Sequence, residues 1–302
     1  DADVACRCDL VTLSDGPEYA DKTMMDYSSG EITTAEAAEL IRTVDEAFRT
    51  DKLLFYPGIS YRHCMIWHDG PTGLNLTPPH DISDQKITEY LPGNPVILDL
   101  MRRSYEVLKD HPVNQARRAR GLNPANSIWL WGEGTRPAVS GFEAVYKVKG
   151  SVISAVDLIK GIGICAGMKV IEVEGATGNI DTNFKGKGEA ALRTLLDGQD
   201  LVYIHVEAPD ECGHHGDLEG KIRSIELIDE QIVGPLLAGL EKAGEDYSIL
   251  VMPDHPTPIA IKTHVSDPIP YLLYRSTGAI GEGANTYTEK TAAAGRYEEH
   301  GY

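Results

Sequence analysis

The chain has few basic residues for its acidic content, and it has no long apolar run. Lys and Arg total 28 against 46 Asp and Glu, which gives the 302 residues a net charge of −18. This balance argues against a general nucleic-acid binder, which needs a basic patch, and against attraction to an anionic membrane surface. Because no apolar run approaches the roughly 18 residues of a membrane span, we expect neither a nucleic-acid partner nor a membrane partner.

Cysteine is scarce, and no two cysteines have the CxxC spacing of a redox or zinc motif. The five cysteines, an odd number, are Cys6, Cys8, Cys64, Cys165 and Cys212. This argues against a disulfide framework and favours the reducing cytoplasm as the location. The overall composition, 42% hydrophobic and 25% charged, is typical of a folded protein.

The start of the chain lacks an initiator Met and a signal peptide. Asp1 is followed almost at once by a β-rich alternating segment, Val4 to Leu13. We therefore expect the sequence to come from the middle of a longer protein. Its length by itself suggests two domains of about 150 residues each.

Residues 1–122 combine strand and helix patterns. Thr33 and Thr34 can cap a helix with apolar residues at helical spacing, and Pro95 to Leu108 predicts a second helix. The apolar positions of the first helix are Ala37, Leu40, Ile41, Val44 and Phe48. Strands are predicted at 53–56 and 59–67, and a long loop at 69–93.

The pattern changes near Asn123. The continuous apolar run Ile128 to Trp131 predicts a strand buried on both faces, as does Tyr247 to Met252. Between them strands alternate with helices, and the longest helix is predicted from Asp217 to Ala243. Such alternation predicts a parallel α/β sheet, in which active sites lie outside the carboxyl ends of the strands.

Two polar motifs fall at predicted strand ends. In H-V-E-A-P-D-E-C-G-H-H-G-D, Asp210 and His214 are four residues apart and can meet on one helical turn. The second motif is the adjacent pair Asp254 and His255, which is followed by His264. Carboxylate and imidazole ligands suit Zn²⁺ or Mn²⁺, so the sequence predicts a metal site at this edge of the sheet.

These residues and several other segments resemble one enzyme family. The segments are ISYRH, NSIWLWGEG, ISAVDLIKGIG, EGATGNIDTN, HVEAPDECGHHGD and VMPDHPTP. In this order they look like the archaeal-type cofactor-independent (2,3-bisphosphoglycerate-independent) phosphoglycerate mutases of the alkaline phosphatase superfamily. The resemblance runs from Val4 to about Tyr274.

The resemblance implies an α/β fold, with an alkaline-phosphatase-like parallel-sheet core interrupted by an inserted α+β substrate domain. By position, residues 1–122 resemble the inserted substrate-binding domain, and residues 123–302 resemble the C-terminal part of the metalloenzyme core. That core is expected to be incomplete, because the family's N-terminal segment is missing. The implied reaction interconverts 3-phosphoglycerate and 2-phosphoglycerate by metal-dependent phosphotransfer through a phosphoserine.

The family implies two divalent metal ions, Mn²⁺ or Zn²⁺, with Mg²⁺ and Co²⁺ as further options. By resemblance Asp210, His214 and His264 hold one ion, and Asp254 and His255 hold the other together with an Asp and the nucleophilic Ser. No Ser of this chain lies in a matching context. We therefore expect the nucleophile to lie outside the chain, and the chain alone to be inactive with partial or empty metal sites.

Three cations are expected to bind the small phosphorylated carboxylic acid. Arg62, in S-Y-R-H, and Lys160, in D-L-I-K-G, match family motifs, and Arg7 is the next candidate. Arg suits this task because its guanidinium group binds phosphate and carboxylate in a bidentate manner. Arg117 and its basic neighbours are instead expected to form a solvated helix face.

Two alternatives stay open. Glu31 stands where we expect the His of a family segment D-Y-S-A-G-H-I. The changed charge favours a homoserine kinase-like or other phosphotransferase branch of the same family. The missing Ser and Asp favour an inactive fragment or a binding module.

Overall fold

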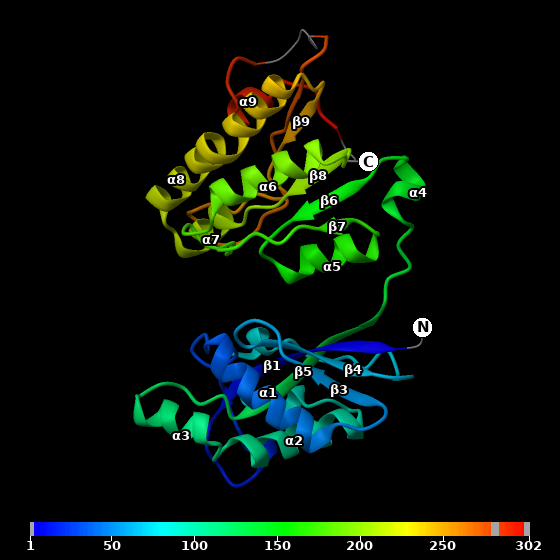
Figure 1. The fold of residues 1–302 in the computed structure, drawn as a ribbon. Helices are drawn as coiled ribbons and strands as arrows, with labels where there is room; N and C mark the ends of the chain where they lie inside the picture. The colour runs from blue at the N-terminus through cyan, green and yellow to red at the C-terminus, as the bar shows by residue number, and fades with distance from the viewer. Residues whose placement is uncertain (1–2, 279–283, 299–302) are drawn as a thin grey trace. The chain divides into compact units, whose positions relative to one another are not determined.

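The computed structural model describes residues 3–278 and 284–298, and the chain divides into two compact units, Asp1–Pro137 and Ala138–Tyr302 (Figure 1). Each unit has its own hydrophobic core, and we describe each by itself. Within the described ranges, no helix combines the length and the apolar character needed to cross a membrane.

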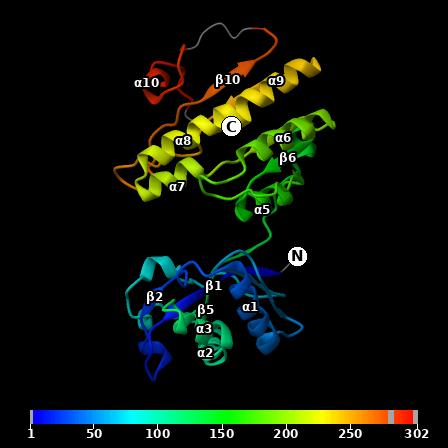
Figure 2. The ribbon, with the colours of Figure 1, turned by 60° about the vertical axis from the view of Figure 1, so that its left-hand side comes forward.

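The first unit is an antiparallel sheet covered by helices. Its central strand β1 (Val4–Leu13) pairs with β4 and β5 along most of its length. It pairs with β2 near its end, and Figure 2 labels β1, β2 and β5. The other elements are β2 (Met24–Asp26), α1 (Thr34–Phe48), β3 (Leu53–Tyr56), β4 (Arg62–Trp67), α2 (Pro95–Leu108), α3 (Pro112–Ala119) and β5 (Ser127–Thr135), with 3₁₀ turns at Tyr19–Asp21, Pro79–Ile82 and Thr88–Tyr90.

Successive side chains of β1 point alternately to the core and to the opposite face of the sheet. Cys6, Cys8 and Leu10 are buried in one cluster with residues of α1 and α2, whereas Arg7 is exposed. The predicted first helix is confirmed: Thr33 accepts a hydrogen bond from the Glu36 amide at the start of α1. The buried residues of α1 are the predicted Ala37, Leu40, Ile41, Val44 and Phe48.

The boundary between the units differs from the predicted one at residues 122 and 123. The structure places it after Pro137, because β5 pairs with β1 from Val11↔Ser127 to Val4↔Thr135. The apolar run Ile128 to Trp131 is therefore a strand of the antiparallel sheet, and its interpretation as part of a parallel sheet is wrong. Ile128, Trp129 and Leu130 are apolar because they join the core of the first unit.

The second unit contains the expected parallel sheet, with strand order β7-β6-β8. Helices α5 and α6 connect these strands, as expected for parallel pairing. The elements are α4 (Phe142–Tyr146), β6 (Gly150–Ile153), α5 (Asp157–Cys165), β7 (Lys169–Val170), α6 (Phe184–Leu196), β8 (Leu201–Ile204), α7 (Ala208–His215), α8 (Leu218–Ile228), a π-helical turn (Asp229–Val233), α9 (Gly234–Ala243), β9 (Ser248–Val251), β10 (Leu272–Arg275) and α10 (Glu289–Ala292).

One prediction for the second unit is confirmed and one needs correction. The helix predicted from Asp217 to Ala243 runs through α8, the π-helical turn and α9. Ile232 of the turn is buried, whereas Ile222 of α8 is 51% exposed. The strand predicted to be buried at Tyr247 to Met252 is β9, which pairs antiparallel with β10. Leu250 of that strand is 56% exposed.

Candidate functional site

The predicted metal ligands come from two segments of the second unit. Asp210 lies in the first turn of α7, directly after β8, and His214 follows one helical turn later. Asp254, His255 and His264 lie in the irregular segment between β9 and β10. The fold therefore brings residues that are 50 positions apart in sequence to one place, since His214 and His264 are in contact.

Three of these side chains converge. His214 Nε2 lies 3.3 Å from Asp210 Oδ2, and His264 Nε2 lies 3.4 Å from Asp210 Oδ1. The two Nε2 atoms are 3.1 Å apart. One ligand atom from each residue lies within 4.8 Å of the others, which is the spacing needed for a shared divalent ion.

Neighbouring groups orient these ligands. His214 Nδ1–H donates to the Lys262 carbonyl oxygen at 3.0 Å, which leaves Nε2 free to act as a ligand. Thr257 Oγ1 donates a hydrogen bond to Asp210 Oδ1. The donor set of one carboxylate and two imidazoles fits Zn²⁺ or Mn²⁺, so the residues present fit the expected metal.

The other predicted pair lies beside this cluster. The His255 ring is 3.8 Å from the His264 ring, and His255 Nε2 is 3.5 Å from Asp254 Oδ2. Among the residues that the structure describes, Asp254 and His255 are not part of a three-ligand group. Their role as ligands of a second ion stays a prediction.

The first unit places Arg7 and Arg62 on the same face of its sheet. Arg62 stands opposite Asp9 in the β1–β4 register, and Arg7 lies two residues from Asp9 on β1. The Arg7 guanidinium group stacks on Trp131, 4.4 Å from the ring centroid. Both arginines are exposed, which leaves them accessible to an anion.

Asp9 is a neighbour of both arginines in the strand register and is 2% exposed. Trp131 Nε1–H donates to Asp9 Oδ2 at 2.7 Å. Burial raises the pKa of the Asp9 carboxyl to about 6, although the Trp131 hydrogen bond and the charges of Arg7 and Arg62 act in the opposite direction.

Aromatic rings border the same face of the sheet. The His80 ring lies 5.3 Å from Trp131 and 6.1 Å from Tyr27, and Tyr27 packs edge-on against Tyr61. Arg62 lies 5.2 Å from the Tyr61 ring centroid. His80 belongs to the loop predicted at 69–93, so this part of the loop lies beside Trp131, on which Arg7 stacks.

The remaining cations have partners of their own. Lys160 belongs to α5 of the second unit, where its Nζ lies 2.7 Å from Glu172. Arg117, predicted to be solvated, is 2% exposed and forms an ion pair with Glu36 at 2.6 Å. That prediction is wrong because α3 packs against α1, and the helix pattern alone does not reveal this contact.

Three buried serine side chains, Ser28, Ser151 and Ser154, serve local structure. Ser151 Oγ donates to Gln199, and Ser154 Oγ donates to Glu207 Oε1 at 3.3 Å. Ser28 Oγ donates to Asp26, whose carboxylate also accepts from the Gly30 amide. All three serines are buried, so none of them is an exposed nucleophile.

The segment that contains Glu31 is a tight turn. Asp26 organises this turn through hydrogen bonds to Ser28 and Gly30, and Asn123 Nδ2 also donates to Asp26. Glu31 is exposed and has a φ of 49°, a left-handed conformation that is uncommon for Glu. Asp26 and Ser28 therefore have a structural role, because their hydrogen bonds stabilise this turn.

Sequence reasoning missed Asp9, Trp131, Lys187 and Glu207. Asp9 shares the face of Arg7 because side chains of a strand alternate with period two, so this signal was present in the sequence. Lys187 is fully buried, and its Nζ donates to the His205 carbonyl oxygen at 3.1 Å. Lys187 lies in α6, and nothing in the sequence of this helix predicts that its side chain is buried.

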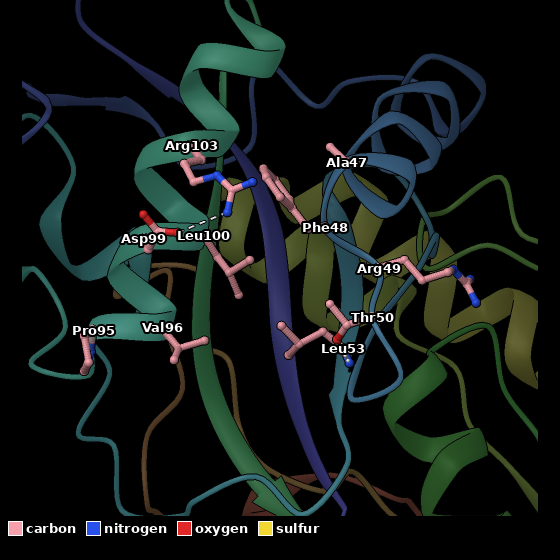
Figure 3. A pocket seen from close by; sticks show the side chains of 10 residues that line it. All are labelled: Ala47, Phe48, Arg49, Thr50, Leu53, Pro95, Val96, Asp99, Leu100 and Arg103. Carbon is pink, nitrogen blue, oxygen red and sulfur yellow. Dashed lines mark hydrogen bonds and ion pairs between the residues drawn. The ribbon is translucent and has the colours of Figure 1, made fainter.

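A hollow of about 370 Å³ lies elsewhere on the first unit, beside α1 and α2 (Figure 3). Phe48, Leu53 and Leu100 supply apolar walls, and Arg103 pairs with Asp99 at its rim. None of the predicted metal or substrate residues lines this hollow.

Known proteins resemble the whole chain. The profile of the Metalloenzyme superfamily matches residues 33–295. The probable 2,3-bisphosphoglycerate-independent phosphoglycerate mutase of Geobacter sulfurreducens is 49% identical, over all of this chain and 75% of that protein. The 2,3-bisphosphoglycerate-independent phosphoglycerate mutase of Methanosarcina barkeri is 48% identical, over 97% of this chain and 73% of that protein.

A solved structure shows a similar fold. The PH0037 protein of Pyrococcus horikoshii superposes with a TM-score of 0.74 at 25% sequence identity. The similarity covers 96% of this chain and 68% of that protein.

Proposed function

Because the chain belongs to the 2,3-bisphosphoglycerate-independent phosphoglycerate mutase family of the Metalloenzyme superfamily, we propose that it functions in the interconversion of 3-phosphoglycerate and 2-phosphoglycerate. The reaction proceeds by metal-dependent phosphotransfer through a phosphoserine. The observation that carries this proposal is the convergence of Asp210, His214 and His264 in a chain that is 49% identical to a named mutase.

Members of this superfamily use divalent metal ions. In the proposal Asp210, His214 and His264 hold one ion, and Asp254 and His255 contribute to a second. Mn²⁺ and Zn²⁺ are the first candidates for both, and Mg²⁺ and Co²⁺ follow. A bound ion supplies positive charge that neutralises a transferring phosphoryl group.

The residues of the chain bind and orient the substrate in this proposal. Arg7 and Arg62 hold the anionic groups of a small phosphorylated carboxylic acid, supported by their exposure on one face of the sheet. Lys160 is the third proposed cation, and substrate would replace Glu172 as its partner. The aromatic rings beside Arg7 and Arg62 reduce the access of water to the bound acid.

The proposed location is the cytoplasm. All five cysteines are free thiols, which suits a reducing compartment and a small metabolite as substrate.

A coupled assay of the full-length protein tests the proposed function. Purified protein is supplied with 3-phosphoglycerate and Mn²⁺, and formation of 2-phosphoglycerate is measured through enolase. We expect turnover that a chelator abolishes and that His214→Ala lowers by at least a hundredfold. ATP-dependent phosphorylation of homoserine without mutase turnover would contradict the proposal and favour the kinase-like branch suggested by Glu31.

A further inference from the structure

We propose that Asp9 binds the free hydroxyl group of the substrate, beside the two arginines that bind its anionic groups. This inference rests on the proposed function, and it adds a residue that determines which phosphorylated acids the first unit accepts. Its basis is an unused acceptor atom at the centre of a face whose cations are exposed.

The strand register fixes where Asp9 lies. On one side of β1 it stands opposite Arg62 of β4, and on the other side it stands opposite Trp129 of β5. Arg7, two residues earlier, stands opposite Trp131. Asp9 therefore lies in the middle of three adjacent strands, with a guanidinium group on its own strand and another on the neighbouring strand.

One oxygen of Asp9 is used and the other is not. Oδ2 accepts the hydrogen bond from Trp131, whereas Oδ1 is buried and has no partner among the described residues. A buried acceptor without a donor is costly, and most such groups in proteins are satisfied. The structure thus leaves one acceptor position for a donor from outside the chain.

The arginines do not fill this position. Arg7 stacks on Trp131 and Arg62 lies over Tyr61, and in the described part of the chain neither forms an ion pair with Asp9. The arginines influence the carboxyl group through their charge, but no direct ion pair with it occupies their guanidinium groups. An anionic ligand group would be repelled by Asp9 but attracted by the arginines.

The chemistry selects a ligand with two anionic groups and a hydroxyl between or beside them. The hydroxyl is a neutral donor, so it can approach the Asp9 carboxylate while phosphate and carboxylate groups contact Arg7 and Arg62. In 3-phosphoglycerate the hydroxyl is on C2, and in 2-phosphoglycerate it is on C3. Both therefore offer the donor that Oδ1 lacks.

A purely structural role for Asp9 makes a different prediction. If Asp9 only holds the Trp131 indole, then removing the indole N–H should affect binding as much as removing the carboxylate. A test must therefore separate the hydroxyl of the ligand from the orientation of Trp131.

Isothermal titration calorimetry, in the presence of a chelator, provides that test. The whole chain is titrated with 3-phosphoglycerate and with 3-phosphonooxypropanoate, which is the same molecule without the 2-hydroxyl group. We expect the wild-type chain to bind 3-phosphoglycerate about tenfold more tightly, as for one hydrogen bond to a charged group. Equal affinity of the wild-type chain for the two ligands would overturn the inference without any variant.

Two variants complete the design. Asp9→Leu keeps the branching and the number of heavy atoms of the side chain and should lose the discrimination between the two ligands, whereas Trp131→Phe keeps the carboxylate and should retain it. Loss of discrimination in both variants to the same extent would overturn the inference in favour of the structural role. Circular dichroism checks that both variants are folded.

Arg62→Met separates this inference from the proposed function. If 3-phosphoglycerate does not bind the wild-type chain, or binds Arg62→Met equally well, the proposed substrate face is wrong and the role of Asp9 falls with it. If binding depends on Arg62 but the 2-hydroxyl group does not affect the affinity, only the role of Asp9 is overturned.

Discussion

At the residue scale, two buried titratable groups of the first unit have opposite effects on how its stability changes with pH. Asp9 and His63 lie on adjacent strands, β1 and β4, and burial shifts the pKa of each toward its neutral form. The pKa of Asp9 is raised to about 6, and that of His63 is lowered to about 4. Their effects on stability therefore fall in the same pH window with opposite signs.

In the Asp9→Asn variant, the free energy of unfolding of the first unit, relative to that of wild type, should increase as the pH rises from 4.5 to 7. The folded carboxyl holds its proton more tightly than the unfolded one, so its stabilising contribution is present at low pH and is lost as the pH rises through about 6. The relative gain should be about 2 kcal/mol. Urea unfolding followed by tryptophan fluorescence measures it, because Trp67, Trp129 and Trp131 all lie in the first unit. A difference that does not vary with pH would contradict the raised pKa.

His63→Asn should have the opposite effect. Between pH 4 and 6.5 the unfolded imidazole binds a proton that the folded one does not, so wild-type stability falls as the pH drops through this window. The variant removes that loss, and its oxygen can still accept the hydrogen bond that the Gly58 amide donates to His63 Nδ1. Between pH 7 and pH 4.5, the free energy of unfolding of the variant should fall by about 2 kcal/mol less than that of wild type. The same fluorescence experiment would disprove this if both proteins respond equally to acid.

At the element scale, α7 carries two of the three predicted metal ligands because of its position after β8. Parallel strands direct the segments at their carboxyl ends to one edge of the sheet, and α7 begins there with Asp210 in its first turn. One helical turn then places His214 beside Asp210. The third group, His264, comes from the distant segment between β9 and β10.

Zn²⁺ should raise the melting temperature of the chain through this cluster. A ligand at about 100 times its Kd adds about 2.7 kcal/mol, or roughly 5–10 °C for a unit of this size. His214→Ala should abolish the shift, and His215→Ala, the exposed neighbour on α7, should retain it. Circular dichroism at 222 nm measures the transition. Tight binding of two ions per chain would contradict the expectation of a single partial site.

At the scale of the whole molecule, each unit is organised around its own core. The first unit is held by β1, which pairs with strands before and after the helices of that unit. The second unit is built around the parallel β7-β6-β8 sheet and the helices α6 and α9. The position of β5 decides to which unit residues 123–137 belong.

A pair of truncations should show this division. Residues 1–137 retain β5 and should unfold cooperatively in urea, whereas residues 1–122 lack the strand that pairs with β1 from Val4 to Val11. Without it the core loses Ile128, Trp129 and Leu130, and we expect no cooperative transition. Cooperative unfolding of residues 1–122 by circular dichroism would contradict the boundary after Pro137.

The sequence by itself determined the elements whose signals are local. The period of α1, the cap at Thr33, the parallel strand–helix alternation after β6 and the ordered metal motifs are all visible in short windows. The resemblance to the mutase family rests on such windows too, and the comparisons confirm it. The roles of Arg7, Arg62 and Lys160 and the assignment of the metal ligands stay predictions.

Only the tertiary structure decided which of these elements pair and which side chains are buried. Ile128 to Trp131 has the same pattern in a parallel or an antiparallel sheet, so its pairing with β1 could not be predicted from the run itself. Likewise, Asp9 and Arg117 have the sequence signature of exposed charges, but both are buried in the folded first unit. Burial and partner choice depend on contacts between segments about 80 to 120 residues apart, such as Arg117 with Glu36 and Asp9 with Trp131, and local patterns carry no information about such contacts.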